Sequence, residues 1–245
     1  MPPTAGLAWL AAGWADFRAR PLIGLLHGLV MAAFGGFVLV AAHDRFWLLA
    51  GAFSGFLLVA PVVAVGLYAI SRAREAGQAA GLADVIAVWR SGDRRLMTFG
   101  LLLALAGTGW VMTSAAFITL FSSVPVNAPA DFLRHVVLGR DWLFEAWLLL
   151  GGLLAAPVFA SSVIAIPLLL DRPVSVLVAV LTSWRVVLAN PVALGIWAAL
   201  LMLLTLIGML AALIGLVVVM PVLGHASWHA YRALVPDGTA GEGAR

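Results

Sequence analysis

The chain has 245 residues, of which 64% are hydrophobic and only 10% are charged, against about 25% charged residues in an ordinary soluble domain. This composition excludes a water-soluble globular protein, and the absence of cysteine excludes disulfides, thiolate metal sites and cysteine nucleophiles. The net charge of +3 arises from 14 basic residues that are all arginine and lie at the ends of apolar runs, which excludes a nucleic-acid-binding face. We therefore predict an integral membrane protein that contacts membrane lipids and no nucleic acid.

Six apolar runs are long enough, or nearly long enough, to cross a hydrocarbon core of about 30 Å. In chain order they are 21–42, 46–70, 96–121, 142–170, 191–209 and 211–233. They predict an all-α, polytopic fold of six transmembrane helices arranged as three hairpins, within one membrane domain over residues 1–235. The loop of the second hairpin, SSVPVNAPADFLRHVVLGRD, has room for a short surface helix. The last hairpin is the weakest of the three, since one bent segment over 191–233 would explain the same pattern.

The arginines also predict the orientation. Only Arg45, Arg134 and Arg140 fall on one side of the six predicted spans, and the rest of the 14 fall on the other side. Because cytoplasmic loops carry the excess of basic residues, both termini are expected in the cytoplasm. The glycine-rich tail over 236–245 is expected to be disordered there.

Three similar segments precede the predicted hairpins. Trp14 lies seven residues before Pro21, Trp184 lies seven before Pro191, and Trp89 holds the matching position in the middle of the chain, where no proline follows. These segments are too short and too charged to span, so each predicts an interfacial amphipathic helix. The chain then reads as a pseudo-threefold internal repeat with units of about 6–74, 82–172 and 174–234.

Residues at the ends of the runs predict how the helices are held in the membrane. Aromatic and arginine side chains at these ends are expected to be membrane-interface anchors: Trp14, Arg20, Tyr68, Arg72, Trp89, Trp184, Trp228 and Arg232. Small residues four apart allow helices to approach closely in lipid, so they predict helix packing: Gly24, Gly28 and Gly36 on the first run, and Gly51 and Gly55 on the second.

Two histidines near the end of the chain are the candidate metal ligands. The segment PVLGHASWHAYR, residues 221–232, aligns with PVVAVGLYAISR, residues 61–72, through its proline, aromatic and arginine positions, but His225 and His229 stand opposite Val65 and Ala69. Both histidines lie on one helical face, and His27 is expected at a similar depth. Because no carboxylate lies at a matching depth on neighbouring positions, a hydrogen-bonded helix end is favoured and a metal or haem site is the alternative.

Four segments carry a family resemblance: WADFRARPLIGLLHGL, LVAPVVAVGLYAISRAREAG, SWRVVLANP and GLVVVMPVLGHASWHAYRAL. They resemble an uncharacterised family of bacterial integral membrane proteins, a domain of unknown function that is sometimes auto-labelled cytochrome c oxidase subunit I. The resemblance implies a multi-pass protein of the bacterial inner membrane and no established activity. The oxidase function is not carried over, because this chain is much shorter and lacks the histidine array of an oxidase subunit.

Three functions remain open. The first is a non-enzymatic structural, assembly or lipid-organising membrane component, with other membrane subunits or a second copy as partners. The second is a transporter or channel for a small or amphipathic solute, with a cavity lined by the middle hairpin. The third is a haem- or copper-handling protein that uses His27, His225 and His229. No catalytic residue and no bound cofactor is predicted under the first.

Overall fold

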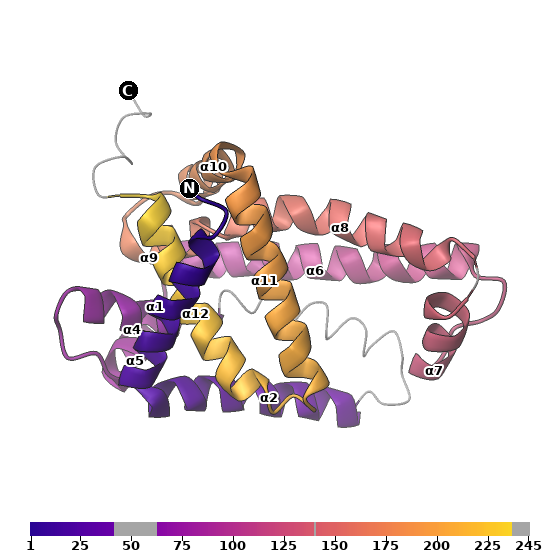
Figure 1. Cartoon of the computed structure of the whole chain (residues 1–245), viewed down its shortest axis with the longest axis horizontal. Helices are drawn as coiled ribbons and strands as arrows, with labels where there is room; N and C mark the ends of the chain where they lie inside the picture. The colour runs from indigo at the N-terminus through magenta and orange to yellow at the C-terminus, as the bar shows by residue number, and fades with distance from the viewer. Residues whose placement is uncertain (42–62, 140, 237–245) are drawn as a thin grey trace. The chain divides into compact units, whose positions relative to one another are not determined.

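The computed structural model describes residues 1–41, 63–139 and 141–236, except for the side chain of Ala41. The described chain is helical and has no strand (Figure 1). Its elements are α1 (Ala5–Ala19), α2 (Pro21–Ala41), α4 (Val65–Glu75), α5 (Leu82–Arg90), α6 (Arg94–Phe121), α7 (Pro129–Asp131), the π-helix η1 (Phe132–Val137), α8 (Leu143–Ser162), α9 (Ala165–Asp171), α10 (Val176–Ala189), α11 (Pro191–Leu210) and α12 (Leu216–Leu234).

Four segments of the described chain are long and apolar enough to cross a membrane. They are Pro21–Val40, Arg94–Phe121, Leu143–Asp171 and Pro191–Leu210. Of the two other predicted spans, 46–70 falls mostly outside the described residues. The second, 211–233, corresponds to α12, whose C-terminal half carries His225, His229 and Arg232. Six spans therefore stay a prediction.

Short helices occupy the three predicted lead-in positions: α1, α5 and α10. The first and third end in the same way, with Arg20 at φ −137°, ψ 58° and Asn190 at φ −135°, ψ 49°, each directly before a proline. A residue before proline is disfavoured in the helical region, so the helix must end there, and the proline then starts the next helix. α5 has no such proline and turns instead through Gly92, whose φ is +58°.

Contacts divide the chain into two parts, which are described separately. The first, here called the core part, comprises Met1–Ala33, Pro61–Phe99 and Ala160–Arg245. The second, the hairpin part, comprises Phe34–Ala60 and Gly100–Phe159.

The helices of the core part pack in a cyclic order. α1 packs on α12, α5 packs on α4, and α10 packs on α9, while α4, α9 and α12 contact one another pairwise (Figure 1). Each lead-in helix thus lies against the last helix of the preceding predicted unit, with the first unit following the third. A threefold repeat would produce this order, although the repeat itself stays a prediction.

A tight turn joins α11 and α12. Ala212 and Leu213 adopt left-handed conformations, with φ of 52° and 65°. A Cβ on Gly215 would lie 2.8 Å from the Cα of Gly208, so only glycine allows the two helix ends to approach this closely. The segment 191–233 is therefore two helices and a turn rather than one bent helix.

Close helix contacts in the core part depend on glycines. A Cβ on Gly24 would lie 2.7 Å from the Phe17 ring, and one on Gly28 would overlap the backbone of Val217 in α12. A Cβ on Gly36 would meet nothing within 4 Å, and Gly51 and Gly55 lie outside the described residues.

Gly13 was not among the predicted packing residues. A Cβ there would lie 2.5 Å from the backbone nitrogen of Ala226, so this glycine lets α1 approach α12.

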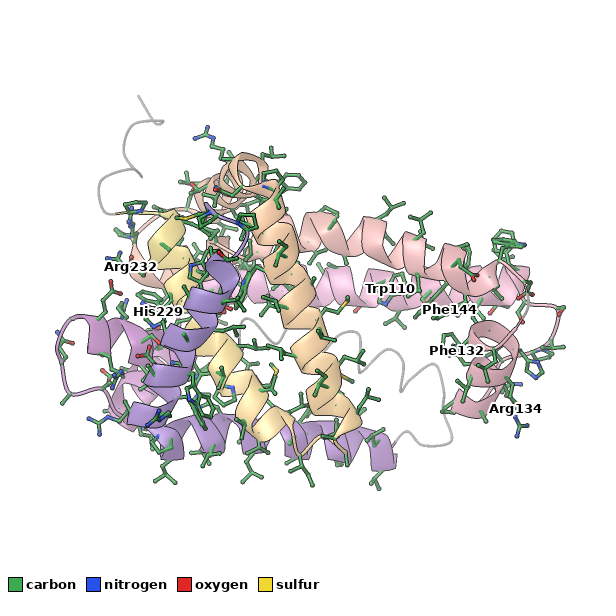
Figure 2. All side chains as sticks on the ribbon, viewed as in Figure 1. Trp110, Phe132, Arg134, Phe144, His229 and Arg232 are labelled. Carbon is green, nitrogen blue, oxygen red and sulfur yellow. The ribbon has the colours of Figure 1, made fainter. Side chains whose placement is uncertain are left out.

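The hairpin part is built on contacts between α6 and α8. The Trp147 indole N–H donates to Ser114 Oγ at 2.7 Å, and a Cβ on Gly151 would lie 3.0 Å from the Trp110 ring. The predicted short surface helix in the loop is α7 with η1, whose Phe132 lies edge-on to Trp147 at 5.3 Å. Figure 2 labels Phe132 and Trp110 in this part.

Candidate functional site

The C-terminal half of α12 carries the polar side chains of the candidate site. Up to Val222 the helix is apolar apart from backbone groups, and after it come His225, Ser227, His229 and Arg232. Residues four apart share a helical face, so His225 and His229 both point toward the helices that pack on α12. Among those helices, α1 and α4 supply the hydrogen-bond partners of the two histidines.

Asp16 of α1 is the centre of a hydrogen-bond network. Its Oδ2 lies 2.8 Å from His229 Nε2 and accepts the Ser71 hydroxyl at 2.6 Å, and its Oδ1 accepts Arg74 Nε–H at 2.9 Å. Ser71 Oγ also lies 2.8 Å from His225 Nδ1. We call Asp16, Ser71, Arg74, His225 and His229 the Asp16 network; it joins α1, α4 and α12.

The positions of the protons follow from the charge of Asp16. Burial raises the pKa of this carboxyl, but hydrogen bonds from His229, Ser71 and Arg74 outweigh it and lower the pKa from 3.8 to about 2. An ionised carboxylate only accepts, so Ser71 donates to Asp16 and must accept from an Nδ1–H of His225. His229 correspondingly donates its Nε2–H to Asp16.

The network runs from a partly exposed end to a buried one. The side chains of Arg74 and His229 are 33% and 27% exposed, whereas Ser71 and His225 are 1% exposed. A polar group that loses its partner at the buried end cannot be rescued by water, so each member depends on the others.

A second cluster lies further along α12. Glu75, the last residue of α4, accepts the Trp228 indole N–H at 3.0 Å and Arg232 Nε–H at 2.9 Å. Asp171, the last residue of α9, accepts the Tyr231 hydroxyl at 2.7 Å and lies 3.7 Å from an Arg232 nitrogen. Figure 2 labels His229 of the Asp16 network and Arg232 of this cluster, both on α12. The ends of all three mutually packed helices are thus tied together by polar contacts.

The third candidate ligand, His27, is not joined to the network by a hydrogen bond. Its Nδ1 lies 2.9 Å from the Ile23 carbonyl of its own helix, and its Nε2 lies beside Gly66 of α4. Within the described residues, no three His, Cys, Asp or Glu side chains are arranged to hold a metal ion. The haem or copper hypothesis therefore gains no geometric support from this part of the chain.

The predicted anchor residues fall into different environments. Trp14, Arg20 and Trp89 are exposed, whereas Tyr68 and Trp228 are buried within the core part. Several anchors make specific contacts: Trp184 donates to Ser161 Oγ at 2.9 Å, Arg72 donates to the Leu170 carbonyl at 2.7 Å, and Arg232 and Trp228 bind Glu75 as described above. Their anchoring role stays a prediction, but for Tyr68 and Trp228 the neighbours are protein atoms.

Sequence reasoning missed the acidic partners of the histidines. We expected no carboxylate at the depth of His225 and His229, yet Asp16, from a lead-in helix rather than a span, bonds His229 directly and is linked to His225 through Ser71. One signal was present: Asp16 is the only acid in its lead-in segment and stands between Trp14 and Arg18. Ser71, Arg74 and Glu75 carried no such signal, since any helix end at a membrane surface has similar residues.

No curated protein and no solved structure matches the chain. One family matches it, over residues 48–171, about half of the chain, and this family is described as predicted integral membrane protein, DUF2189. The apolar helices of the structure agree with that description. The chain therefore belongs to the DUF2189 family of predicted integral membrane proteins, whose function is unknown.

Proposed function

We propose that this protein is a non-enzymatic component of the membrane that organises lipid or supports the assembly of a larger membrane complex. One observation carries the proposal: the most polar residues of the core part are used to hold its helices to one another. The Asp16 network and the Glu75 and Asp171 cluster join α1, α4, α9 and α12.

The chemistry of the network supports a structural role. A nucleophile or general base needs access to a substrate, whereas Ser71 and His225 are 1% exposed and bonded to each other. Buried polar networks in which every member is satisfied make one arrangement of helices much more favourable than others. A rigid core of this kind suits a protein that presents apolar helix faces to lipid or to partner subunits.

The hairpin part offers a weaker basis for the transporter hypothesis. Two hydroxyl groups of the middle hairpin already have partners within the protein: Ser114 accepts from Trp147, and Thr108 donates to the Ala104 carbonyl of its own helix. Both groups are therefore occupied by contacts within the protein.

We further propose that the protein lies in the bacterial inner membrane with both termini in the cytoplasm. The distribution of the 14 arginines supports this orientation. A reporter fused after Arg245 should report a cytoplasmic end, and a reporter signal from the opposite side would refute the orientation.

The function is tested by extracting the full chain with its surrounding membrane into polymer nanodiscs. Proteomics and lipid analysis of the purified discs should find a stoichiometric partner, or a lipid enriched over the bulk membrane. Liposomes that contain the pure protein should show no solute flux. A chain that carries bulk-like lipid and no partner, or that conducts a solute, would overturn the proposal.

A further inference from the structure

A cavity of about 610 Å³ lies in the core part between α4, α5 and the start of α6. Its walls are mostly small or aliphatic, including Ala69, Ala73 and Leu170, and its polar lining includes Arg72, Asp84 and Ser91. Beside the cavity, Val85 of α5 packs with Ile70 and Ala73 of α4. The volume is typical of a site for a small ligand.

The cavity lies in the α4–α5 interface at the position that corresponds to the Asp16 network in the α1–α12 interface. α5 packs on α4 as α1 packs on α12, and Ala69 is the counterpart of His229 in the alignment of the two helix ends. Ser91 is the counterpart of Asp16, since each stands two residues after the tryptophan of its lead-in helix. Where one interface holds an imidazole and a carboxylate, the other holds a methyl group and a hydroxymethyl group, and both of these line the cavity.

The arginine of this interface also lacks the acids that its counterpart has. Arg232 lies 2.9 Å from Glu75 and 3.7 Å from Asp171. Arg72 occupies the matching position in α4, and among the described residues its guanidinium binds only the Leu170 carbonyl. A guanidinium without a carboxylate, in the wall of a cavity, is suited to bind an anionic group such as a phosphate.

A negative charge lines the same cavity. Asp84 accepts the backbone N–H of Gly81 at 2.8 Å through Oδ2, and no described cation lies within ion-pair distance of it. The other acid in the lining, Asp93, is already paired with Arg95 at 2.6 Å. The cavity therefore offers one unpaired cation and one unpaired anion, which disfavours a purely anionic ligand.

We propose that this cavity binds a zwitterionic head group that carries a phosphate and a primary ammonium, with the phosphate on Arg72 and the ammonium at Asp84. This chemistry occurs in an ethanolamine phospholipid and in a free phosphorylated amine. The inference deepens the proposed function, on which it rests, by naming the class of lipid that the protein would retain.

The test is native mass spectrometry of the full chain in neutral detergent. The protein is titrated with dioleoyl phosphatidylethanolamine, with dioleoyl phosphatidylglycerol, which lacks the ammonium, and separately with O-phosphoethanolamine. The wild type should retain the ethanolamine lipid in preference to the glycerol lipid. Stronger binding of the glycerol lipid, or equal binding of the two, would overturn the proposal.

Variants test whether Arg72 binds the phosphate and Asp84 binds the ammonium of the head group. Arg72→Gln should weaken binding of the ethanolamine lipid by about tenfold or more, the cost of one lost charge-assisted hydrogen bond. Asp84→Asn keeps an oxygen for Gly81 and should remove the preference over the glycerol lipid. Arg90→Gln is the matched control, because it removes an exposed arginine of α5 that is not part of the lining. Unchanged binding by both cavity variants would refute the assignment.

A filling variant tests the comparison between the interfaces. Ala69→His combined with Ser91→Asp introduces at this interface the pair of side chains, histidine and aspartate, that is present between α1 and α12. The double variant should fill the cavity and abolish retention of the head group, while its helical content stays unchanged. If this variant misfolds, the comparison of Arg72→Lys with Arg72→Gln decides the question. Arg72→Lys preserves the charge and should retain binding of the ethanolamine lipid, whereas Arg72→Gln should weaken it.

The titration with O-phosphoethanolamine distinguishes a soluble ligand from a membrane lipid, and the nanodisc experiment tests the proposed function separately from this cavity. Binding of O-phosphoethanolamine as tight as that of the lipid would identify a soluble source, whereas binding of the lipid alone would identify the membrane. Absence of any head-group preference in the wild type would overturn this inference alone. The proposed function would still be decided by the partners found in nanodiscs.

Discussion

The carboxylate of Asp16 and the imidazole of His229 lie 2.8 Å apart, although 213 positions separate them along the chain. Their contact brings the first helix of the protein against its last one, at the point where Gly13 lets the backbones of α1 and α12 approach. Ser71 and Arg74 reach the same carboxylate from α4. The contact that closes the cyclic packing order thus includes one carboxylate, that of Asp16, which binds side chains from two other helices.

Replacing the Asp16 carboxylate should destabilise the core part. Asp16→Asn removes the charge and puts an amide donor against the donors of Ser71, Arg74 or His229, so we expect a loss of about 2 kcal/mol or more in the free energy of unfolding. Thermal or denaturant unfolding of the purified protein in detergent, followed by circular dichroism, measures the effect. Asp141→Asn, at an exposed acid, is the control and should change stability by less than about 0.5 kcal/mol.

Stability should also depend on pH through the same residue. The folded-state pKa of Asp16, about 2, lies below the value of 3.8 for the free side chain, so the unfolded chain binds a proton more readily. The resulting stabilisation, about 2 kcal/mol, is present above pH 3.8 and is lost as the pH falls from there toward about 2. Unfolding midpoints measured from pH 6 to pH 2.5 should show this loss in the wild type and less of it in Asp16→Asn; equal slopes would contradict the assignment.

Local sequence patterns were sufficient to locate the three short helices that precede the predicted hairpins. Trp14, Trp89 and Trp184 marked three short helices, which are α1, α5 and α10 in the structure. These segments could be recognised because they are too short and too charged to span a membrane. The last hairpin was also expected, and the left-handed residues Ala212 and Leu213 show how so short a connection is made.

The partners of the polar residues could not be predicted in the same way. The hydrogen bonds of Ser71 to Asp16 and to His225 join positions 55 and 154 residues apart, and no local spacing records such a contact. Trp228 shows the same limit, since a tryptophan one turn before an arginine at a helix end has one sequence pattern whether it faces lipid or protein. Only the packing of α4 on α12 decides between the two.

Trp228 itself provides a test of this distinction. Its indole is fully buried and donates to Glu75, so Trp228→Phe loses a hydrogen bond to a carboxylate and leaves a gap, for an expected cost of about 2 kcal/mol. Trp89→Phe alters a side chain that is 54% exposed and should cost little. Unfolding in detergent micelles compares the two variants, and equal effects would favour an interfacial anchor for both tryptophans.

The turn between α11 and α12 should be sensitive to a single methyl group. In Gly215→Ala the new Cβ would lie 2.8 Å from the Cα of Gly208 and 3.0 Å from its carbonyl oxygen, so the two helix ends must separate. We expect a cost of about 1–3 kcal/mol, typical of overpacking. Gly195→Ala is the matched control in α11, since its Cβ would meet nothing within 4 Å and alanine favours the helix by about 1 kcal/mol. The two variants should therefore change the unfolding midpoint in opposite directions. A shift of the same sign in both would mean that α11 and α12 do not approach through Gly208 and Gly215 in the membrane protein.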